Sequence, residues 1–145
     1  MNARALIVLL ALRLCLAPAA ADAQRPDHIF RIGRLTLASP SADDLEGLRQ
    51  GLRELGYIEG QNIVIEPRSA EGNVDRLGAL ALDLVRQHLD VIVAGGSPAI
   101  PAVQQATRTI PIVMTTDTDA VAQGFVVSLA RPGGNSTGLA GLGVE

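Results

Sequence analysis

The sequence predicts an α/β protein built around an open, doubly wound parallel sheet. Short apolar runs rich in β-branched residues, clearest at 90–94, alternate along the chain with amphipathic helical patterns. Strands separated by helical patterns of about 10 to 15 residues are typical of βαβ units. Right-handed crossovers then place every strand-to-helix loop at one edge of the sheet, where the ligands of such folds bind.

The first strand is expected at 29–37 and the first helix from about Ser41. The strand is nearly continuous in apolar residues, as expected where both faces of a sheet are covered. The helix has one apolar stripe of leucines at steps of three, four and three, which are Leu45, Leu48, Leu52 and Leu55. Ser41 is a candidate N-cap with Asp44 three residues on, and Gly56 is a candidate C-terminal stop.

The middle of the chain repeats this pattern. A second strand is expected at 62–66, and a second helix from an Asn73 cap to about His88. The β-branched strand at 90–94 follows, and the Gly95-Gly96 pair ends it. The order of strand and helix therefore continues through the first two thirds of the chain.

The remaining elements are shorter. Ser97-Pro98 opens a third helix, because proline is compatible with the first helical position. Pro101 is less favourable, since an intrahelical N–H bond is expected by that point. The pattern then predicts a strand at 110–115, a short helix at 121–130 and the beginning of a fifth strand at 136–139.

Composition excludes several classes of function. The chain has 145 residues and a formal net charge of −3, and all twelve of its basic side chains are arginines. An acidic chain without a basic cluster is a poor candidate for nucleic-acid binding. The single cysteine, Cys15, can form neither an intrachain disulfide nor a cysteine-based zinc site. No cofactor motif is present, so we expect no cofactor.

Residues 1–23 predict an export signal. Eighteen of these 23 residues are hydrophobic, against 51 of the remaining 122. An early arginine, an apolar stretch and a small-residue end form the layout of a cleavable signal peptide. Arg13 interrupts the apolar run, which disfavours a membrane anchor, and the bulky Leu14 before the cysteine disfavours a lipoprotein site. We expect the mature chain to begin at Gln24.

The predicted strand-to-helix loops at the carboxyl edge hold the candidate ligand-binding residues. These candidates are Ser39, Ser41, Gly95, Gly96, Ser97, Thr116, Asp117 and Asp119. Helix capping is an alternative role for the serines and Asp119, and the glycines are also explained by a tight turn. If the loops do bind a ligand, the start of a helix after a Gly-Gly turn favours an anion such as a carboxylate or phosphate.

Catalytic or metal chemistry at these loops lacks a supporting motif. The Gly95-Gly96-Ser97 turn has neither the G-x-G-x-x-G spacing nor a P-loop, and the chain has no lysine to hold a phosphate. Asp117 and Asp119 lack the remaining ligands of a calcium loop, so we expect no metal. As general acid and base they would need partners that perturb their pKa values. Recognition of a ligand amine or hydroxyl is the simpler functional interpretation.

Five segments carry a resemblance to a known family. The two longest are G-L-R-E-L-G-Y-x-E-G-x-N-I at 51–63 and A-R-P-G-G-N-x-T-G at 130–138. Shorter ones lie at 31–33, 90–96 and 110–113, in the same order along the chain. Together they resemble the substrate-binding proteins of bacterial ABC transporters, in the family that includes tryptophan-binding, TrpX-like members.

The resemblance implies a type I periplasmic-binding fold, in which two α/β lobes close over a small organic solute such as an amino acid. It also implies a periplasmic location, an inner-membrane permease and a cytoplasmic ATPase as partners, and no catalysis. The family's binding loops correspond to Ser39-Pro40-Ser41, Gly95-Gly96-Ser97-Pro98 and Asp119-Ala120. Ala120 departs from the proline that is usual there.

The sequence stops at Glu145, where such a chain would pass into its second lobe. We therefore expect residues 24–145 to form a single Rossmann-like N-terminal lobe with half of a binding site. Two alternatives stay open. One is an enzyme on the same sheet that uses Asp117 or Asp119 beside the Gly95-Gly96 turn, and the other is a non-functional fragment.

Overall fold

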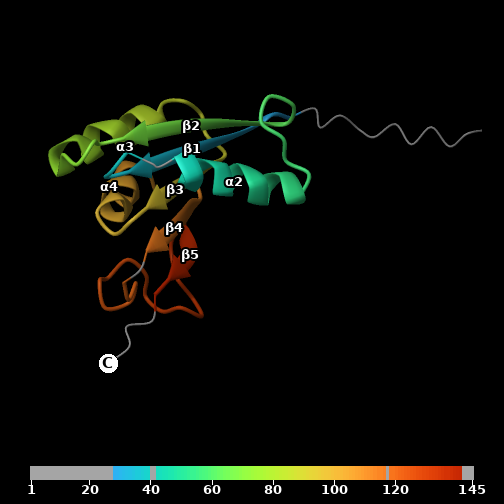
Figure 1. The fold of residues 1–145 in the computed structure, drawn as a ribbon. Coiled ribbons are helices and arrows are strands. Elements are labelled where there is room, and N and C mark those ends of the chain that lie inside the picture. The colour runs from blue at the N-terminus through green and yellow to red at the C-terminus, as the bar shows by residue number, and fades with distance from the viewer. Residues whose placement is uncertain (1–27, 40–41, 117, 142–145) are drawn as a thin grey trace, which may run out of the picture.

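A computed structural model describes residues 28–39, 42–116 and 118–141. They form one five-stranded sheet with the order β2-β1-β3-β4-β5, and all neighbouring strands are parallel (Figure 1). The strands are β1 (Phe30–Thr36), β2 (Ile63–Ser69), β3 (Val91–Gly95), β4 (Ile112–Thr116) and β5 (Ser136–Ala140). The predicted α/β fold class with an open parallel sheet is confirmed.

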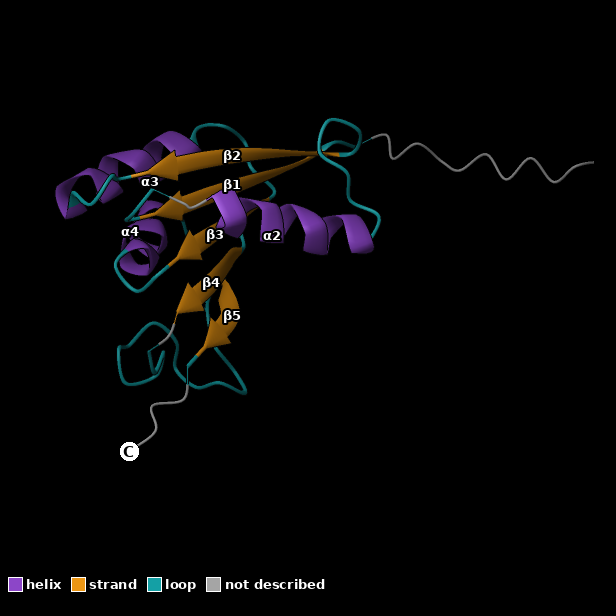
Figure 2. Cartoon of the chain, in the orientation of Figure 1, coloured by secondary structure: helices purple, strands orange, loops and turns teal. Residues whose placement is uncertain are grey.

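Helices cover the two faces of the sheet unequally (Figure 2). The helix α2 (Ala42–Glu54) lies on one face, where it packs against β1 and β2. The 3-10 turn η1 (Val74–Arg76) leads into α3 (Leu77–Val85), which lies with α4 (Ala99–Ala106) on the other face. The connection after β1 leads to β2 on one side of it, and the connection after β3 leads to β4 on the other side. The strand order therefore reverses between β1 and β3.

Two apolar clusters hold the layers together. The larger one lies between the sheet and the pair α3 and α4. Its largest fully buried members are Leu35, Leu84, Ile92, Ile100, Val103 and Ile112. The smaller one lies under α2. It consists of Ile32, Ile63 and Ile65, with the partly buried Leu45, Leu48, Leu52, Val91 and Val93 packed against it. The main core is therefore on the α3 and α4 face.

Gly56 ends α2 as predicted. It has a φ of +85°, and its N–H and that of Tyr57 donate to the carbonyls of Arg53 and Leu52 at 3.0 and 2.9 Å. This is the left-handed glycine stop that closes many helices. Leu55, the fourth leucine of the predicted stripe, lies past the end of the helix and is 75% exposed.

The second predicted helix is shorter than expected. Asn73 is the predicted cap, and its Oδ1 accepts a hydrogen bond from the Asp75 N–H at 3.0 Å. It caps the 3-10 turn η1, so the α-helix itself begins only at Leu77. The helix ends at Val85, before the predicted end at His88, because His88 has a left-handed φ of +53°.

Two prolines lie inside regular elements. The helix α4 begins at Ala99, so Pro101 is its third residue, and the first four N–H groups of a helix have no intrahelical acceptor. The penalty expected at Pro101 was therefore wrong. The strand β2 runs through Pro67 to Ser69, beyond the predicted end at 66, because an edge strand tolerates a missing donor.

The helix predicted at 121–130 is wrong. The segment makes a single tight turn in which the N–H of Gln123 donates to the Asp119 carbonyl at 3.0 Å. Gly124 follows with a φ of +73°, a conformation that ends a right-handed helix. An apolar run with one glycine can belong to a helix or to a folded loop, and here the glycine decides the outcome.

No helix among the described residues is long and apolar enough to span a bilayer. The predicted signal peptide at 1–23, with its expected cleavage before Gln24, lies outside those residues, and so do Ser41 and Asp117. The roles predicted for them stay predictions.

Candidate functional site

The carboxyl ends of β1 and β3 meet where the strand order reverses. Thr36, the last residue of β1, pairs in register with Gly95, the last residue of β3. An open hollow of about 360 Å³ lies at this point. Its lining residues are Arg34, Thr36, Leu37, Ala38, Ser39, Asp44, Gly95, Gly96 and Thr115. Three predicted ligand residues, Ser39, Gly95 and Gly96, therefore line a hollow where open α/β sheets bind their ligands.

The two glycines have structural roles in this hollow. A Cβ on Gly95 would lie 2.9 Å from Cγ2 of Thr36, so a side chain there would displace the Thr36 side chain. Gly96 has a φ of +83°, and its N–H donates to the Thr115 carbonyl at 2.8 Å. The tight-turn interpretation thus accounts for both residues, and contact between their backbone and a ligand stays a prediction.

Three hydroxyl groups meet at the carboxyl ends of β3 and β4. The Oγ of Ser97 lies 2.7 Å from Oγ1 of Thr116 and 3.0 Å from Oγ1 of Thr118, and the two threonine oxygens are 2.9 Å apart. Ser97 does not cap α4, whose N-cap is Pro98. Each hydroxyl has two lone pairs besides its proton, so the cluster retains acceptor capacity for a ligand amine or hydroxyl.

Asp119 acts as the cap of a turn. Its Oδ1 accepts hydrogen bonds from the N–H groups of Val121 and Ala122 at 2.9 and 3.1 Å, and the residue is exposed. The capping interpretation of the sequence therefore holds for this carboxylate, although the element that it caps is a turn and not a helix. The neighbouring loop position Asp117 lies outside the described residues.

Arg34 is a lining residue that the sequence interpretation missed. Side chains alternate along a strand, so Arg34 shares the α2 face of β1 with Ile32 and Thr36. Its Nη1 is buried and has no hydrogen-bond partner among the described residues. The available signal was an arginine in the middle of the strand, between the buried Gly33 and Leu35, because a charged side chain is costly inside a sheet unless it has a partner.

A larger hollow of about 570 Å³ lies beside α4, on the other face of the sheet. Two of its polar side chains, Gln104 and Asn135, hydrogen-bond to backbone carbonyls. Gln104 donates to the Phe125 carbonyl at 2.8 Å, and Asn135 donates to the Ile110 carbonyl at 2.7 Å. These bonds hold the loop before β5 against α4, which favours an architectural role for this region.

Two described carboxyl groups have displaced pKa values, and neither lines the hollow at β1 and β3. The pKa of Asp90 is lowered chiefly because its Oδ2 accepts the Arg31 backbone N–H at 2.7 Å, while burial opposes the effect and His28 adds to it. On the exposed side of α2, the Arg53 guanidinium lowers the pKa of Glu46. The described part of the chain contains no group of three or more His, Cys, Asp or Glu placed to hold a metal ion.

Comparison with known proteins gives consistent matches. A family model for ABC transporter substrate binding proteins matches residues 36–143. A tyrosine-binding protein of Clostridioides difficile (strain R20291) is 38% identical over 100 residues, which cover 68% of this chain and 29% of the relative.

Two solved structures are similar to most of the chain. A conserved domain protein from Vibrio cholerae O1 biovar eltor has a TM-score of 0.72 and 35% identity. An ABC domain from Streptococcus pneumoniae in complex with L-Trp has a TM-score of 0.70 and 32% identity. Each similarity covers 77% of this chain and 38% of the other chain, so this chain spans well under half of the length of its neighbours.

Proposed function

This chain belongs to the family of ABC transporter substrate-binding proteins, and on that premise we propose that it binds an amino acid for an ABC importer. The solute lies in the hollow between the ends of β1 and β3. The observation that carries the proposal is the position of this hollow at the reversal of strand order, with every lining residue except Arg34 inside the segment that the family match covers.

The chemistry of the hollow supports an amino acid as the solute. Its lining contains a cation, Arg34, and a carboxylate, Asp44, together with the Ser39 side chain. A zwitterion carries both charges that such a lining can complement. The names of the relatives point the same way, since one is a tyrosine-binding protein and another was solved with L-Trp.

The described lobe supplies one wall of the site. An open hollow leaves a bound solute in contact with water, and binding proteins of this architecture enclose the solute between two lobes. We therefore propose that the protein works in the periplasm with a permease and its ATPase, and that the described lobe alone binds its solute weakly. The second wall belongs to the part of the relatives that this chain does not span.

Calorimetry tests this proposal. The chain is titrated with L-tyrosine, L-tryptophan, glycine and glucose, and the aromatic amino acids are expected to bind weakly and glucose not at all. Ser39→Ala removes a hydroxyl from the lining of the hollow and is expected to weaken binding about threefold to tenfold. The matched control, Ser128→Ala, removes a hydroxyl from the loop before β5, outside the lining of the hollow, and keeps the original affinity.

Two results would contradict the proposal. One is binding of glucose in preference to every amino acid, which would exclude the solute class. The other is submicromolar affinity for an amino acid, because one open wall would then suffice and the two-wall site would be unnecessary.

A further inference from the structure

Arg34 differs from the other strand arginines in its lack of partners. Among the described residues, none of the ion pairs includes Arg34, and its buried Nη1 has no hydrogen-bond partner. In register, Arg34 lies between Pro67 on β2 and Val93 on β3, and neither can accept a hydrogen bond through its side chain. Its two register neighbours therefore offer the guanidinium no side-chain acceptor.

An arginine in this setting costs stability. Burial of a cationic donor without an acceptor is unfavourable by far more than the loss of an ordinary hydrogen bond. Arg34 also lines the open hollow together with Ser39 and Gly96, where a molecule from solution can reach it. An anionic group of a solute would supply the missing acceptor.

The geometry points to Arg34 as the residue that receives the carboxylate of the solute. This assignment rests on the proposed function and adds to it the residue that selects for a carboxylate. A planar guanidinium donates two parallel hydrogen bonds to a carboxylate, and a partly buried position strengthens both. A strand residue, Arg34, and not a residue of the predicted loops, therefore binds the charged group of the solute.

The charge of the hollow limits the anion that fits. Asp44, in the first turn of α2, lines the same hollow and places a negative charge there. A group with two negative charges, such as phosphate, is repelled by this carboxylate, whereas an amino acid brings an ammonium group with its single carboxylate. The lining therefore favours a zwitterion with its carboxylate toward Arg34.

The first experiment compares L-tryptophan with tryptamine, which has the same ring and ammonium group without the carboxylate. The unaltered chain is expected to bind L-tryptophan about tenfold to hundredfold more tightly. Arg34→Met should bring both ligands to the affinity of tryptamine, and Arg34→Lys should restore part of the difference. The control variant Arg53→Met removes a charge of the same kind from the far end of α2, and it should keep the full ratio of the affinities for L-tryptophan and tryptamine. If Arg34→Met also keeps the ratio, the assignment is overturned.

A second experiment separates this assignment from the proposed function. The side-chain Nε–H signal of Arg34, identified by its loss in Arg34→Met, is followed by NMR during titration with sodium acetate, sodium phosphate and ethylammonium chloride. A saturable shift with acetate supports the carboxylate site even if no amino acid binds, in which case the proposed solute alone fails. An unmoved signal with acetate, or a shift with phosphate only, overturns the assignment whether or not amino acids bind.

Discussion

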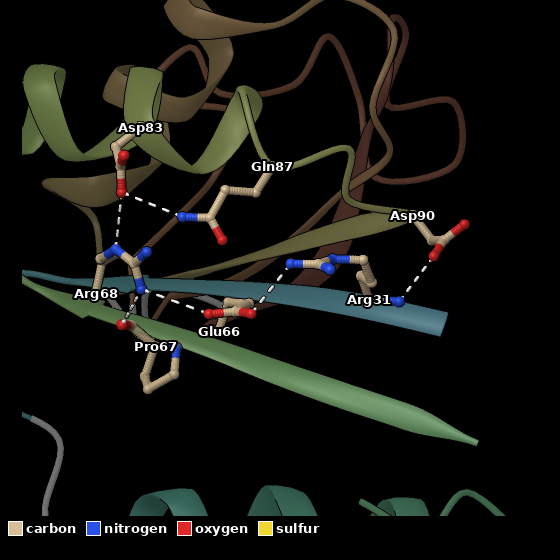
Figure 3. A network of polar contacts seen from close by, with 7 residues as sticks. All are labelled: Arg31, Glu66, Pro67, Arg68, Asp83, Gln87 and Asp90. Carbon is tan, nitrogen blue, oxygen red and sulfur yellow. Dashed lines mark hydrogen bonds and ion pairs between the residues drawn. The ribbon is translucent and has the colours of Figure 1, made fainter. Parts of the chain in front are cut away.

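Arg31 and Arg34 are three residues apart on β1 and point to opposite faces of the sheet. On the α3 face, Nη2 of Arg31 donates to Glu66 at 3.1 Å, and Nε of Arg68 donates to Asp83 on α3 at 2.9 Å (Figure 3). Arg31 also has one buried nitrogen without a partner, its Nε, but its guanidinium is paired. On the α2 face, Arg34 has no such carboxylate within the described chain.

The two faces therefore differ in core size and in how their charges are paired. The α3 and α4 face holds the larger core and neutralises its charges within the chain. The α2 face holds the smaller core and carries Arg34 at the edge of an open hollow. Under the proposed function, solute recognition lies on the side of the sheet opposite the larger core, and natural sites commonly sacrifice local stability in this way.

The largest expected difference between the faces is in their cores. Leu84→Ala removes a fully buried side chain of α3 and should lower the free energy of unfolding by about 3–4 kcal/mol. Leu48→Ala, the same change in the partly buried stripe of α2, should cost about 1–2 kcal/mol. Urea denaturation measures both. Equal losses of unfolding free energy in the two variants would mean that both cores contribute equally to stability, which would contradict this prediction.

The two arginines should shift stability in opposite directions. Arg34→Met removes a buried donor without a partner and keeps an unbranched apolar stem, so the free energy of unfolding should rise by about 1 kcal/mol. Arg31→Met removes a partly exposed ion pair with Glu66 and should lower it by less than about 1 kcal/mol. Thermal and urea unfolding without ligand give both values. A clear loss of stability in Arg34→Met would mean that the guanidinium has a structural role.

Regular periodicity explains why most of the fold could be predicted. The strands and the first three helical segments follow from apolar period and local caps, and Gly56 and Asn73 act where the sequence places them. The helix predicted at 121–130 was wrong because the apolar run fits a helix, and only the backbone conformation of Gly124 rules a helix out.

The site was harder to predict, because its chemistry depends on neighbours in space. Arg31 and Arg34 look alike in sequence, and only the sheet decides which of them meets a carboxylate. Thr118 joins the hydroxyl cluster with Ser97 across 21 positions of sequence, so no local motif marks it. Ser39 and the Gly95-Gly96 pair could be predicted because they lie at or just past the ends of β1 and β3.

The smallest effect concerns the amino end of the paired face. The pKa of Asp90 lies below its ordinary value of 3.8, so its ionised form stabilises the fold at neutral pH, and this contribution is lost as the pH falls through the lowered pKa. The carboxylate is about a third exposed, which limits the contribution to less than about 1 kcal/mol. Asp90→Asn should therefore flatten the loss of stability below about pH 4. His28→Gln should keep most of the pH-dependent loss of stability, because the Arg31 backbone N–H is the main cause of the lowered pKa of Asp90. If His28→Gln flattened the profile as fully as Asp90→Asn, the ring and not the backbone of β1 would hold this carboxylate.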